Sequence, residues 1–546
     1  EPDMHKPLGD LDRLKAVLAK DWGWKDLRVA QHLIPEVQKI LRKENWAVTA
    51  TIHKDMEFSR ATLIALYPGL KNEAYGVACD IGSTTIAMHL VSLLSGRIVA
   101  SAGAPNPQIR FGEDVMSRVS YVMMNPDGRE AMTKAVREAV NGLIGKVCEQ
   151  GGVDRKDIFD SVFVCNPIMH HLFLGIDPTE LGQAPFALAV SGAVQGWTHD
   201  IGIDVNRGAR FYLLPCIAGH VGADAAGATL SEGPHRQDKM MLLVDVGTNA
   251  EIVLGNRNNV VAASSPTGPA FEGAEISSGQ RAAPGAIERV RIDPETFEPK
   301  YRVIGVDNWS DEEGFEEAAK ATGVTGICGS AIIEVVAEMY LSGLISEDGV
   351  VDGALSARTP RIIENGRTFS YLLRDGEPRI TVTQNDIRAI QLAKAALYAG
   401  IKLLMEKQNI TGVDTIRFAG AFGSFIDPKY AMVLGLIPDC DLSEVKAVGN
   451  AAGTGALMAL LNRDHRREIE REVSRIEKIE TALEPDFQQL FINAMALPNK
   501  VDPFPRLSEQ VTLPARNTAS EEGGSVESAT PRRRSREERA ARRGRG

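Results

Sequence analysis

Residues 1–72 combine helical and strand-like patterns of apolar side chains. Apolar residues recur every three or four positions over residues 11–18 and 33–41, which predicts two amphipathic helices. Two β-type runs follow at residues 46–52 and 63–67, and a Pro-Gly turn ends the second run. The pattern predicts a small α/β module over residues 1–72.

The long middle of the chain alternates apolar strand-like runs with helical stretches, which is typical of an α/β fold. Two of the runs resemble each other: residues 75–85 (YGVACDIGSTT) and 241–249 (MLLVDVGTN) are apolar strands that end in Asp-x-Gly-Ser/Thr. Each is followed by two further apolar runs with a turn between them. The repeat predicts a duplicated fold, with one lobe over residues 73–243 and a second lobe over residues 244–500.

The C-terminal part of the chain is more polar. Residues 464–480 predict a charged helix with a thin apolar stripe of Ile469, Val473 and Ile476. Beyond it Ser, Gly, Glu, Pro and Arg become dominant, so residues 501–546 are predicted to form a disordered, Arg-rich tail.

Charge and cysteine content narrow the function class. The formal net charge of −11 argues against nucleic acid or an anionic membrane as a partner. No apolar stretch approaches the roughly 18 residues of a membrane helix, and no signal peptide is recognisable. The six Cys are scattered, with Cys148 and Cys165 as the closest pair, so no zinc or iron–sulfur motif is present. Lone thiols of this kind suit a reducing compartment, and a cytoplasmic location is expected.

The two Asp-x-Gly segments suit phosphate binding. A glycine at a turn between two strands lets backbone N–H groups approach a phosphate closely, and neighbouring hydroxyl groups add donors. One such turn closes many ordinary hairpins, whereas two at matching places in a repeat can clamp a triphosphate from both sides. The predicted phosphate-binding residues are Gly82, Ser83, Thr84 and Thr85 in the first lobe and Gly247, Thr248 and Asn249 in the second.

Acidic residues of the same segments point to a metal ion. Asp80 and Asp245 end the two repeated strands, where their carboxylates can hold Mg²⁺ through water. Glu251 follows the second loop by two residues and either lies near the attacking water or pairs with a neighbouring strand. We predict Asp80, Asp245 and Glu251 as catalytic residues, with Asp80 and Asp245 also serving the metal.

Two further glycine-containing segments are candidate nucleotide contacts. Residues 415–424 form a predicted strand and turn that allow close approach to an adenosine, or that make a purely structural strand-to-helix turn. Gly329 and Ser330 precede a predicted helix over residues 331–341, whose N-terminus suits a phosphate or ribose. The predicted adenosine contacts are Gly420, Ala421, Phe422 and Gly423.

A polar stretch after Pro105 contains Asn106, Gln108, Glu113 and Asp114. The stretch has two interpretations from sequence. It is either a loop that borders the nucleotide site or a capping loop before a predicted helix over residues 115–122.

Together these features resemble the fold shared by acetate and sugar kinases, heat-shock chaperones and actin (the ASKHA fold). The chain is more narrowly similar to the reductive activators of corrinoid proteins, of the RACo and RamA type, from about residue 8 to Pro498. The resemblance is carried by the segments 80–85 (DIGSTT), 106–114 (NPQIRFGED), 169–178 (MHHLFLGIDP), 214–224 (LPCIAGHVGAD), 268–273 (GPAFEG), 281–286 (RAAPGA), 326–330 (GICGS), 419–423 (AGAFG) and 448–450 (VGN).

The resemblance implies a two-lobed, actin-like ATPase with ATP and Mg²⁺ between the lobes. It implies that the enzyme returns a corrinoid protein of a methyltransferase system from Co(II) to Co(I), with electrons from a [2Fe–2S] centre and an electron-donating reductase. Members normally carry that cluster in an N-terminal ferredoxin-type domain. This sequence has no cysteine set for it and begins with Glu, so the cluster is expected in a missing or separate domain. A homodimer is compatible with the resemblance.

Two other classes of function stay open at this point. A small-molecule kinase of the acetate or sugar kinase fold would use the same phosphate loops to phosphorylate a carboxylate or hydroxyl group. An ATP-dependent binding or chaperone-like module would use them without any redox role. Neither class needs an iron–sulfur centre.

Overall fold

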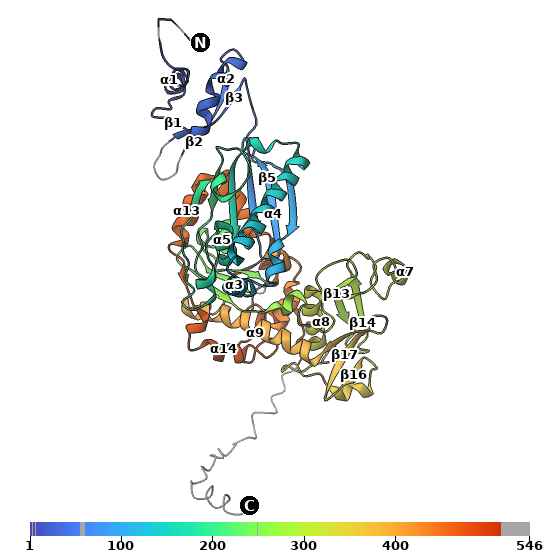
Figure 1. Ribbon diagram of the computed structural model, residues 1–546. Helices are drawn as coiled ribbons and strands as arrows, with labels where there is room; N and C mark the ends of the chain where they lie inside the picture. The colour runs from blue at the N-terminus through green and yellow to red at the C-terminus, as the bar shows by residue number, and fades with distance from the viewer. Residues whose placement is uncertain (3, 6, 55–60, 248, 515–546) are drawn as a thin grey trace, which may run out of the picture.

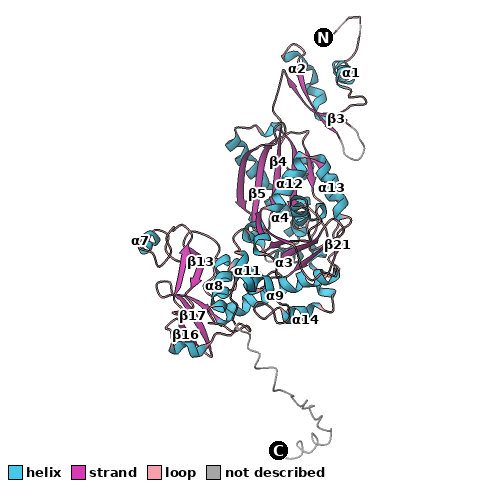
Figure 2. Ribbon diagram, turned by 180° about the vertical axis from the view of Figure 1, so that it is seen from behind, coloured by secondary structure: helices cyan, strands magenta, loops and turns pink. Residues whose placement is uncertain are grey.

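The computed structural model describes residues 1–2, 4–5, 7–54, 61–247 and 249–514. Two six-stranded sheets form its body, with a small module at the N-terminal end and two three-stranded sheets projecting from one side (Figure 1). Helices lie against both large sheets (Figure 2). None of the helices in the described ranges is both long and apolar enough to span a membrane.

The N-terminal module has two helices against a three-stranded sheet of order β1-β3-β2. The predicted helix over residues 33–41 begins later than expected. Because Pro35 has no N–H to donate, residues Gln31–Glu36 form a 3₁₀ turn and the α-helix follows it. The elements are α1 (Asp10–Trp22), β1 (Arg28–Val29), α2 (Val37–Lys43), β2 (Val48–Lys54) and β3 (Ala61–Pro68).

The first large sheet has the order β6-β5-β4-β7-β9-β8. Its first three strands are antiparallel neighbours, and β7 and β9 continue the sheet parallel to β4. Three helices pack on one face of this sheet. The elements are β4 (Tyr75–Ile81), β5 (Thr85–Ser92), β6 (Ile98–Pro105), α3 (Val115–Met124), α4 (Gly128–Gly151), β7 (Ile158–Cys165), α5 (Pro167–Leu174), β8 (Val194–Trp197) and β9 (Arg210–Leu213).

The second large sheet has the order β20-β19-β10-β11-β12-β21, and its first five strands repeat the arrangement β9-β7-β4-β5-β6 of the first sheet. Strands β10, β11 and β12 correspond to β4, β5 and β6, while β19 and β20 take the places of β7 and β9. The predicted duplicated α/β fold is therefore confirmed. The elements are β10 (Met241–Val246), β11 (Ala250–Gly255), β12 (Val260–Ser265), α9 (Gln384–Lys407), β19 (Thr415–Ala419), α10 (Gly420–Gly423), α11 (Pro428–Leu434), β20 (Val445–Gly449) and β21 (Glu477–Lys478).

Two helices form the layer between the sheets, α6 (Ala223–Glu232) and α12 (Ala451–Leu461). Although α12 follows the second sheet in sequence, Ala452, Ala456 and Leu460 pack against the first sheet. The helices approach so closely that a Cβ on Gly455 would overlap the carbonyl of Gly227. The two lobes are therefore not the simple sequence halves that the repeat predicts, because residues 451–473 complete the first.

The side projection lies between β12 and β19 in the sequence. Its two sheets have the orders β14-β13-β15 and β16-β17-β18. The buried carboxylate of Glu334 anchors the first of them to α8 through Arg289 (2.5 Å) and Arg291 (2.6 Å). The elements are β13 (Ala286–Ile292), β14 (Pro299–Val303), α7 (Phe315–Ala319), β15 (Gly326–Ile327), α8 (Gly329–Leu341), β16 (Ile362–Asn365), β17 (Thr368–Arg374) and β18 (Ile380–Thr383).

Two C-terminal predictions have the wrong boundaries. The charged helix α13 (Arg463–Val473) ends before residue 480, and β21 then pairs with β12. The predicted disordered tail is ordered over residues 501–514, where α15 (Pro505–Gln510) buries Leu507 after the short helix α14 (Phe487–Asn493). The rest of the predicted tail, including its Arg-rich end, lies outside the described residues.

Candidate functional site

Both predicted phosphate loops are tight turns between antiparallel strands. In the first, Ile81 pairs with Ile86 and the Gly82 N–H donates to the Thr85 carbonyl at 3.0 Å. A Cβ on Gly82 would lie 2.6 Å from that carbonyl oxygen, so only glycine fits this turn. In the second, Val246 pairs with Ala250, which leaves a turn one residue shorter.

The second turn holds Gly247, whose carbonyl accepts a hydrogen bond from the Thr267 hydroxyl at 2.7 Å. A Cβ on Gly247 would meet the Asn249 carbonyl at 3.3 Å, which is tight. The structure therefore brings Gly247 and Asn249 together in the predicted turn. Thr248, the remaining predicted contact of this loop, lies outside the described residues.

Asp80 and Asp245 face the layer between the two sheets. Side chains two apart on a strand share a face, so Asp80 lies on the face of Ala78 and Asp245 on the face of Leu243. Ala78 packs against α12 and α6, and Leu243 packs against α6 and the start of α12. The two predicted metal-site residues thus come from different sheets and approach the same helical layer.

Four carboxylates interact at this position. Asp224, in the first turn of α6, raises the pKa of Asp80, Asp245 and Glu251 by charge repulsion. Desolvation is the larger cause in each case, and the two together raise the pKa of Asp80 and of Asp245 to about 7. The pKa of Glu251 is raised well above its usual range, and burial also raises that of Asp224. None of the four forms an ion pair with a Lys or Arg in the part of the chain that the structure describes.

This cluster fits a hydrated divalent cation. Unpaired carboxylates held together are unfavourable unless a cation joins them, and carboxylate oxygen is a preferred ligand of Mg²⁺. Within the described ranges, no group of three or more His, Cys, Asp or Glu is close enough to hold a metal ion directly. The arrangement therefore suits an Mg²⁺ ion that retains several of its waters. It does not suit an ion that is bound directly by three carboxylates.

Asn450 connects the two lobes at the same site. It caps α12, where its Oδ1 accepts from the Gly453 N–H at 2.6 Å, and its side chain also forms a hydrogen bond with Asp80. That hydrogen bond favours the ionised form of the carboxyl and lowers the Asp80 pKa against the effect of burial. A residue at the end of the second sheet thus contacts the acidic residue of the first.

The predicted adenosine segment begins beside the carboxylates. Gly420 follows β19 with a φ of +82°, and a Cβ there would overlap Oδ1 of Asp245. Gly420 therefore lets the chain pass Asp245 closely, which the sequence did not reveal. Ala421, Phe422 and Gly423 continue from it as the short helix α10, and the Phe422 ring stacks near Phe271 with ring centroids 6.3 Å apart.

Gly329 and Ser330 lie at the start of α8 as predicted, but protein atoms cover them. A Cβ on Gly329 would overlap the Phe271 carbonyl and lie 2.7 Å from the Phe422 ring. The Ser330 hydroxyl is buried and donates to the Glu288 carbonyl at 3.4 Å. The structure brings Gly329 to the Phe422 segment, and it does not bring either residue to the carboxylates.

The two ends of the polar stretch after Pro105 make different contacts. Asn106 donates from Nδ2 to the Gly82 carbonyl at 2.8 Å, so this end borders the first phosphate loop. At the other end Asp114 caps α3 by accepting from the N–H groups of Met116 and Ser117. The capping interpretation is therefore confirmed at Asp114, and the interpretation of Asn106 as a residue that borders the nucleotide site stays a prediction.

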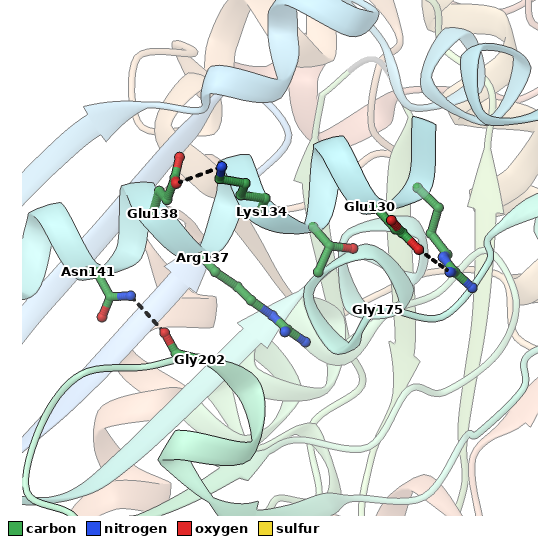
Figure 3. A pocket seen from close by; sticks show the side chains of 9 residues that line it. Glu130, Lys134, Arg137, Glu138, Asn141, Gly175 and Gly202 are labelled. Carbon is green, nitrogen blue, oxygen red and sulfur yellow. Dashed lines mark hydrogen bonds and ion pairs between the residues drawn. The ribbon is translucent and has the colours of Figure 1, made fainter. Parts of the chain in front are cut away.

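A surface recess of about 410 Å³ lies elsewhere, along α4 (Figure 3). Lys134 pairs with Glu138 at 3.8 Å, and Asn141 donates to the Gly202 carbonyl at 2.8 Å. Its lining contains none of the predicted site residues, and α4 covers the face of the first sheet opposite to α12. The recess is thus separate from the carboxylate cluster.

Comparison with known proteins places these features in a family. Three family models cover successive parts of the chain: the RACo linker region over residues 1–73, the RACo middle region over residues 75–237, and the C-terminal domain of RACo, described as the ASKHA domain, over residues 239–508. The corrinoid activation enzyme RamQ of Eubacterium limosum is 34% identical over 498 residues, which are 88% of this chain and 79% of RamQ. The chain belongs to the RACo family of corrinoid activators.

Two further relatives agree with the assignment to the RACo family. A solved structure of a reductive activator for corrinoid, iron–sulfur protein matches with a TM-score of 0.77 and 32% identity, over 91% of this chain and 78% of that one. The [Co(II) methylated amine-specific corrinoid protein] reductase of Methanosarcina barkeri is 24% identical over 74% of this chain and 71% of its own. The ASKHA match supports ATP binding by this RACo-family chain.

Sequence reasoning missed Asp224 and Asn450 as site residues. Both lie in segments that carry the resemblance to RACo, yet neither follows a Gly-Ser/Thr turn. What marks them as site residues is their place in the fold. Asp224 lies in the first turn of α6 and Asn450 caps α12, and these two helices meet between the sheets. The six cysteines are all buried free thiols, and three of them, Cys79, Cys165 and Cys216, lie near one another in the first lobe of this RACo-family chain.

Proposed function

We propose that this protein uses ATP to drive the reduction of a corrinoid protein of a methyltransferase system from Co(II) to Co(I). The observation that carries the proposal is the meeting of two acidic phosphate loops, one from each duplicated sheet, in a chain of the RACo family. The reduction is energetically uphill, and each ~59 mV of a one-electron step costs about 1.4 kcal/mol. ATP is the source of that free energy.

The site residues take distinct roles in this proposal. Asp80 and Asp245 hold Mg²⁺ through water, and the two loops bind the phosphates through backbone N–H groups. When bound, Mg²⁺ neutralises phosphate charge. Glu251 accepts a proton from the attacking water in its ionised form, which a bound cation would favour against the desolvation that raises its pKa. The segment from Gly420 to Gly423 forms the proposed adenosine side, and Gly329 packs behind Phe422 without reaching its surface.

The proposed coupling of ATP to reduction follows from the fact that loops of both large sheets build the site. A triphosphate that contacts both loops binds most tightly when the sheets are at one particular separation, so ATP stabilises that arrangement over others. The hydrogen bond between Asn450 and Asp80 crosses the same gap. Hydrolysis removes the group that joins the loops, and the lobes can then return. We propose that the corrinoid protein binds preferentially to one of these arrangements.

The proposed electron source lies outside residues 1–546. A [2Fe–2S] centre needs several thiolates at one place, whereas the buried cysteines of the described residues form no group of three or more that is close enough to hold a metal ion. An additional domain or a separate protein would carry the cluster and receive its electrons from a reductase. Buried free thiols also agree with the proposed cytoplasmic location.

Absorption spectroscopy of the corrinoid tests this function. The full chain is mixed anaerobically with a Co(II) corrinoid protein, an iron–sulfur donor, a low-potential reductant and MgATP. We expect Co(I) absorbance to appear only when ATP and the chain are both present. Asp245→Asn, which removes the acidic charge without changing side-chain size, should abolish the ATP-dependent signal.

The same mixture separates the proposal from its competitors. Stoichiometric transfer of the γ-phosphate to a small molecule would identify a kinase, and ATP hydrolysis that never changes the cobalt signal with any corrinoid protein would identify a binding module. Either result would overturn the redox proposal. Light scattering on the same preparation tests the proposed homodimer.

A further inference from the structure

Three successive carbonyl groups of the first phosphate loop accept hydrogen bonds from residues outside the loop. The Gly82 carbonyl accepts from Asn106 Nδ2 at 2.8 Å, and the Thr84 carbonyl accepts from the Asn106 backbone N–H at 2.8 Å. Between them, the Ser83 carbonyl accepts from Arg118 Nη2 at 2.6 Å. The loop therefore has a fixed inner side, made by Asn106 and Arg118.

This arrangement directs the loop's N–H groups outward. Cis peptide bonds in the described residues occur only before three prolines, so the loop peptides are trans. In a trans peptide the C=O and the following N–H point in opposite directions. Since the carbonyls of Gly82 and Ser83 point toward Asn106 and Arg118, the N–H groups of Ser83 and Thr84 point away from them. Two successive N–H groups of this kind form a concavity for an anion.

Arg118 is an unusual residue to find in this place. Its side chain is fully buried, and its guanidinium also donates to the Gly112 carbonyl at 3.0 Å and lies 3.3 Å from Met169 Sδ. It forms no ion pair with any residue that the structure describes. Burial lowers its pKa to about 10, so the guanidinium still carries its charge at neutral pH. The carboxylate of Asp114 raises this pKa but does not form a direct ion pair with Arg118. A buried cation without a directly paired carboxylate is unfavourable unless an anion compensates for it.

The second lobe has no equivalent cation at the corresponding position. There the Gly247 carbonyl accepts from the neutral hydroxyl of Thr267. The positive charge behind the phosphate loops is thus confined to the first lobe as far as the described residues show. It lies one peptide unit from the N–H of Thr84, which it polarises through the Ser83 carbonyl.

We infer that Arg118 is a positioning residue for the nucleotide, which orients the first phosphate loop and supplies the positive charge that makes it bind phosphate. The inference rests on the proposed ATP-dependent function and assigns to one lobe the recognition of phosphate charge. Arg118 acts through the Ser83–Thr84 peptide and does not itself touch the nucleotide. Its contribution should therefore grow with the number of phosphates and vanish for adenosine.

Calorimetric titration of the full chain tests this inference, with adenosine, ADP and ATP as ligands in the presence of Mg²⁺. Arg118→Gln keeps a donor near the Ser83 carbonyl and removes the charge. We expect it to weaken ATP binding by about tenfold or more, the usual size of a charge-assisted hydrogen bond, and to change adenosine binding by less than about twofold. Arg118→Lys, which keeps the charge, should restore most of the ATP affinity.

The matched control is Asn106→Ala, which removes a neutral donor to the same loop at the Gly82 carbonyl. It should lower the affinity for ATP. Because Asn106 carries no charge, a lysine at this position should not restore that affinity, unlike the lysine at position 118. Arg118→Met replaces the Gln variant if that protein does not fold. Equal loss of adenosine and ATP affinity, or unchanged ATP affinity in the neutral variants, would overturn the role of Arg118. Absence of ATP binding by the unaltered protein would instead refute the proposed function.

Discussion

Glu251 lies directly opposite Asp245 in the antiparallel pair β10–β11, so the two carboxylates share one face of the second sheet. The residue opposite Asp80 in the first sheet is Ala87. Like charges at directly opposite positions destabilise a sheet, and each carboxylate raises the cost of ionising its neighbour. The acidic pair is therefore a property of the second lobe that the fold does not need.

The first prediction concerns this pair. Glu251→Ala reproduces the arrangement of the first lobe, and we expect it to lower ATP hydrolysis by about 10²–10⁴-fold, the usual contribution of a general base. Nucleotide affinity should change little, because the loops are left intact. Phosphate release and calorimetric binding measure the two effects. Glu364→Ala, at an exposed position of β16, is the control and should hydrolyse ATP normally; undiminished hydrolysis by Glu251→Ala would remove Glu251 from the mechanism.

The second prediction concerns pH. The pKa of Asp245 is raised to about 7 in the folded protein from 3.8, so the folded state holds a proton that the unfolded state has lost between these values. Stability of the ligand-free protein therefore falls as pH rises from about 4 to 7 and then levels off. Each pKa unit corresponds to about 1.4 kcal/mol, which partial exposure reduces, so we expect Asp245→Asn to stabilise the protein by about 1–2 kcal/mol at pH 7.5.

Urea unfolding at pH 5.0, 6.0 and 7.5 measures this effect. Asp245→Asn should have a shallower decline over the range than the unaltered protein. Saturating MgATP should remove most of the decline in the unaltered protein, since the cation offsets the carboxylate charge. An identical pH profile for the two proteins would show that Asp245 ionises normally.

The third prediction uses the contact between Gly420 and Asp245. Gly420→Ala places a Cβ on Oδ1 of Asp245 and forces a left-handed backbone on a residue with a side chain. We expect a loss of about 2–4 kcal/mol in stability and a marked loss of ATP hydrolysis. Gly343→Ala separates the two causes, because Gly343 has a φ of +76° with open space around its Cβ position. The Gly343→Ala protein should be destabilised by only about 1 kcal/mol and should keep its ATP hydrolysis.

The fourth prediction tests the helical layer between the sheets. Gly455→Ala would push α12 away from the Gly227 carbonyl, and we expect a destabilisation of about 1–3 kcal/mol from overpacking. Gly142→Ala in α4 is the matched control, as nothing lies within 4 Å of its Cβ position. That substitution should instead stabilise the helix by up to about 1 kcal/mol. Thermal unfolding should therefore show a lower Tm for Gly455→Ala and a higher Tm for Gly142→Ala, and an unchanged Tm for Gly455→Ala would contradict the close crossing of α6 and α12.

The repeated hairpins were predictable because their signal is local. Asp80 and Asp245 each end a short apolar strand beside a glycine turn, so a few adjacent residues specify strand, turn and acidic end. Other site residues carry no such signal. Asp224 becomes part of the cluster only because α6 lies between the sheets, and an isolated Asp at a helix start is ordinary N-terminal chemistry.

The position of α12 could not be predicted for a related reason. Its apolar side chains specify a buried helix without specifying which sheet buries it. Since Ala452 and Ala456 are small, the same surface would pack against many partners. The tail prediction failed at Phe504 and Leu507, two apolar residues among polar neighbours, whose burial depends on contacts far away in sequence. The average composition of a segment does not reveal single apolar residues that pack against the rest of the protein.

The packing of α12 against the first sheet also limits the order in which the two lobes can fold during synthesis. Side chains of the first sheet, such as Ala78 and Val164, pack against Ala452 and Leu460. On the ribosome that face stays uncovered until the strands of the second sheet up to β20 have been translated. The lobe that is made first therefore stays incomplete until most of the second lobe has been translated, and an N-terminal fragment ending before α12 would emerge with an exposed apolar face.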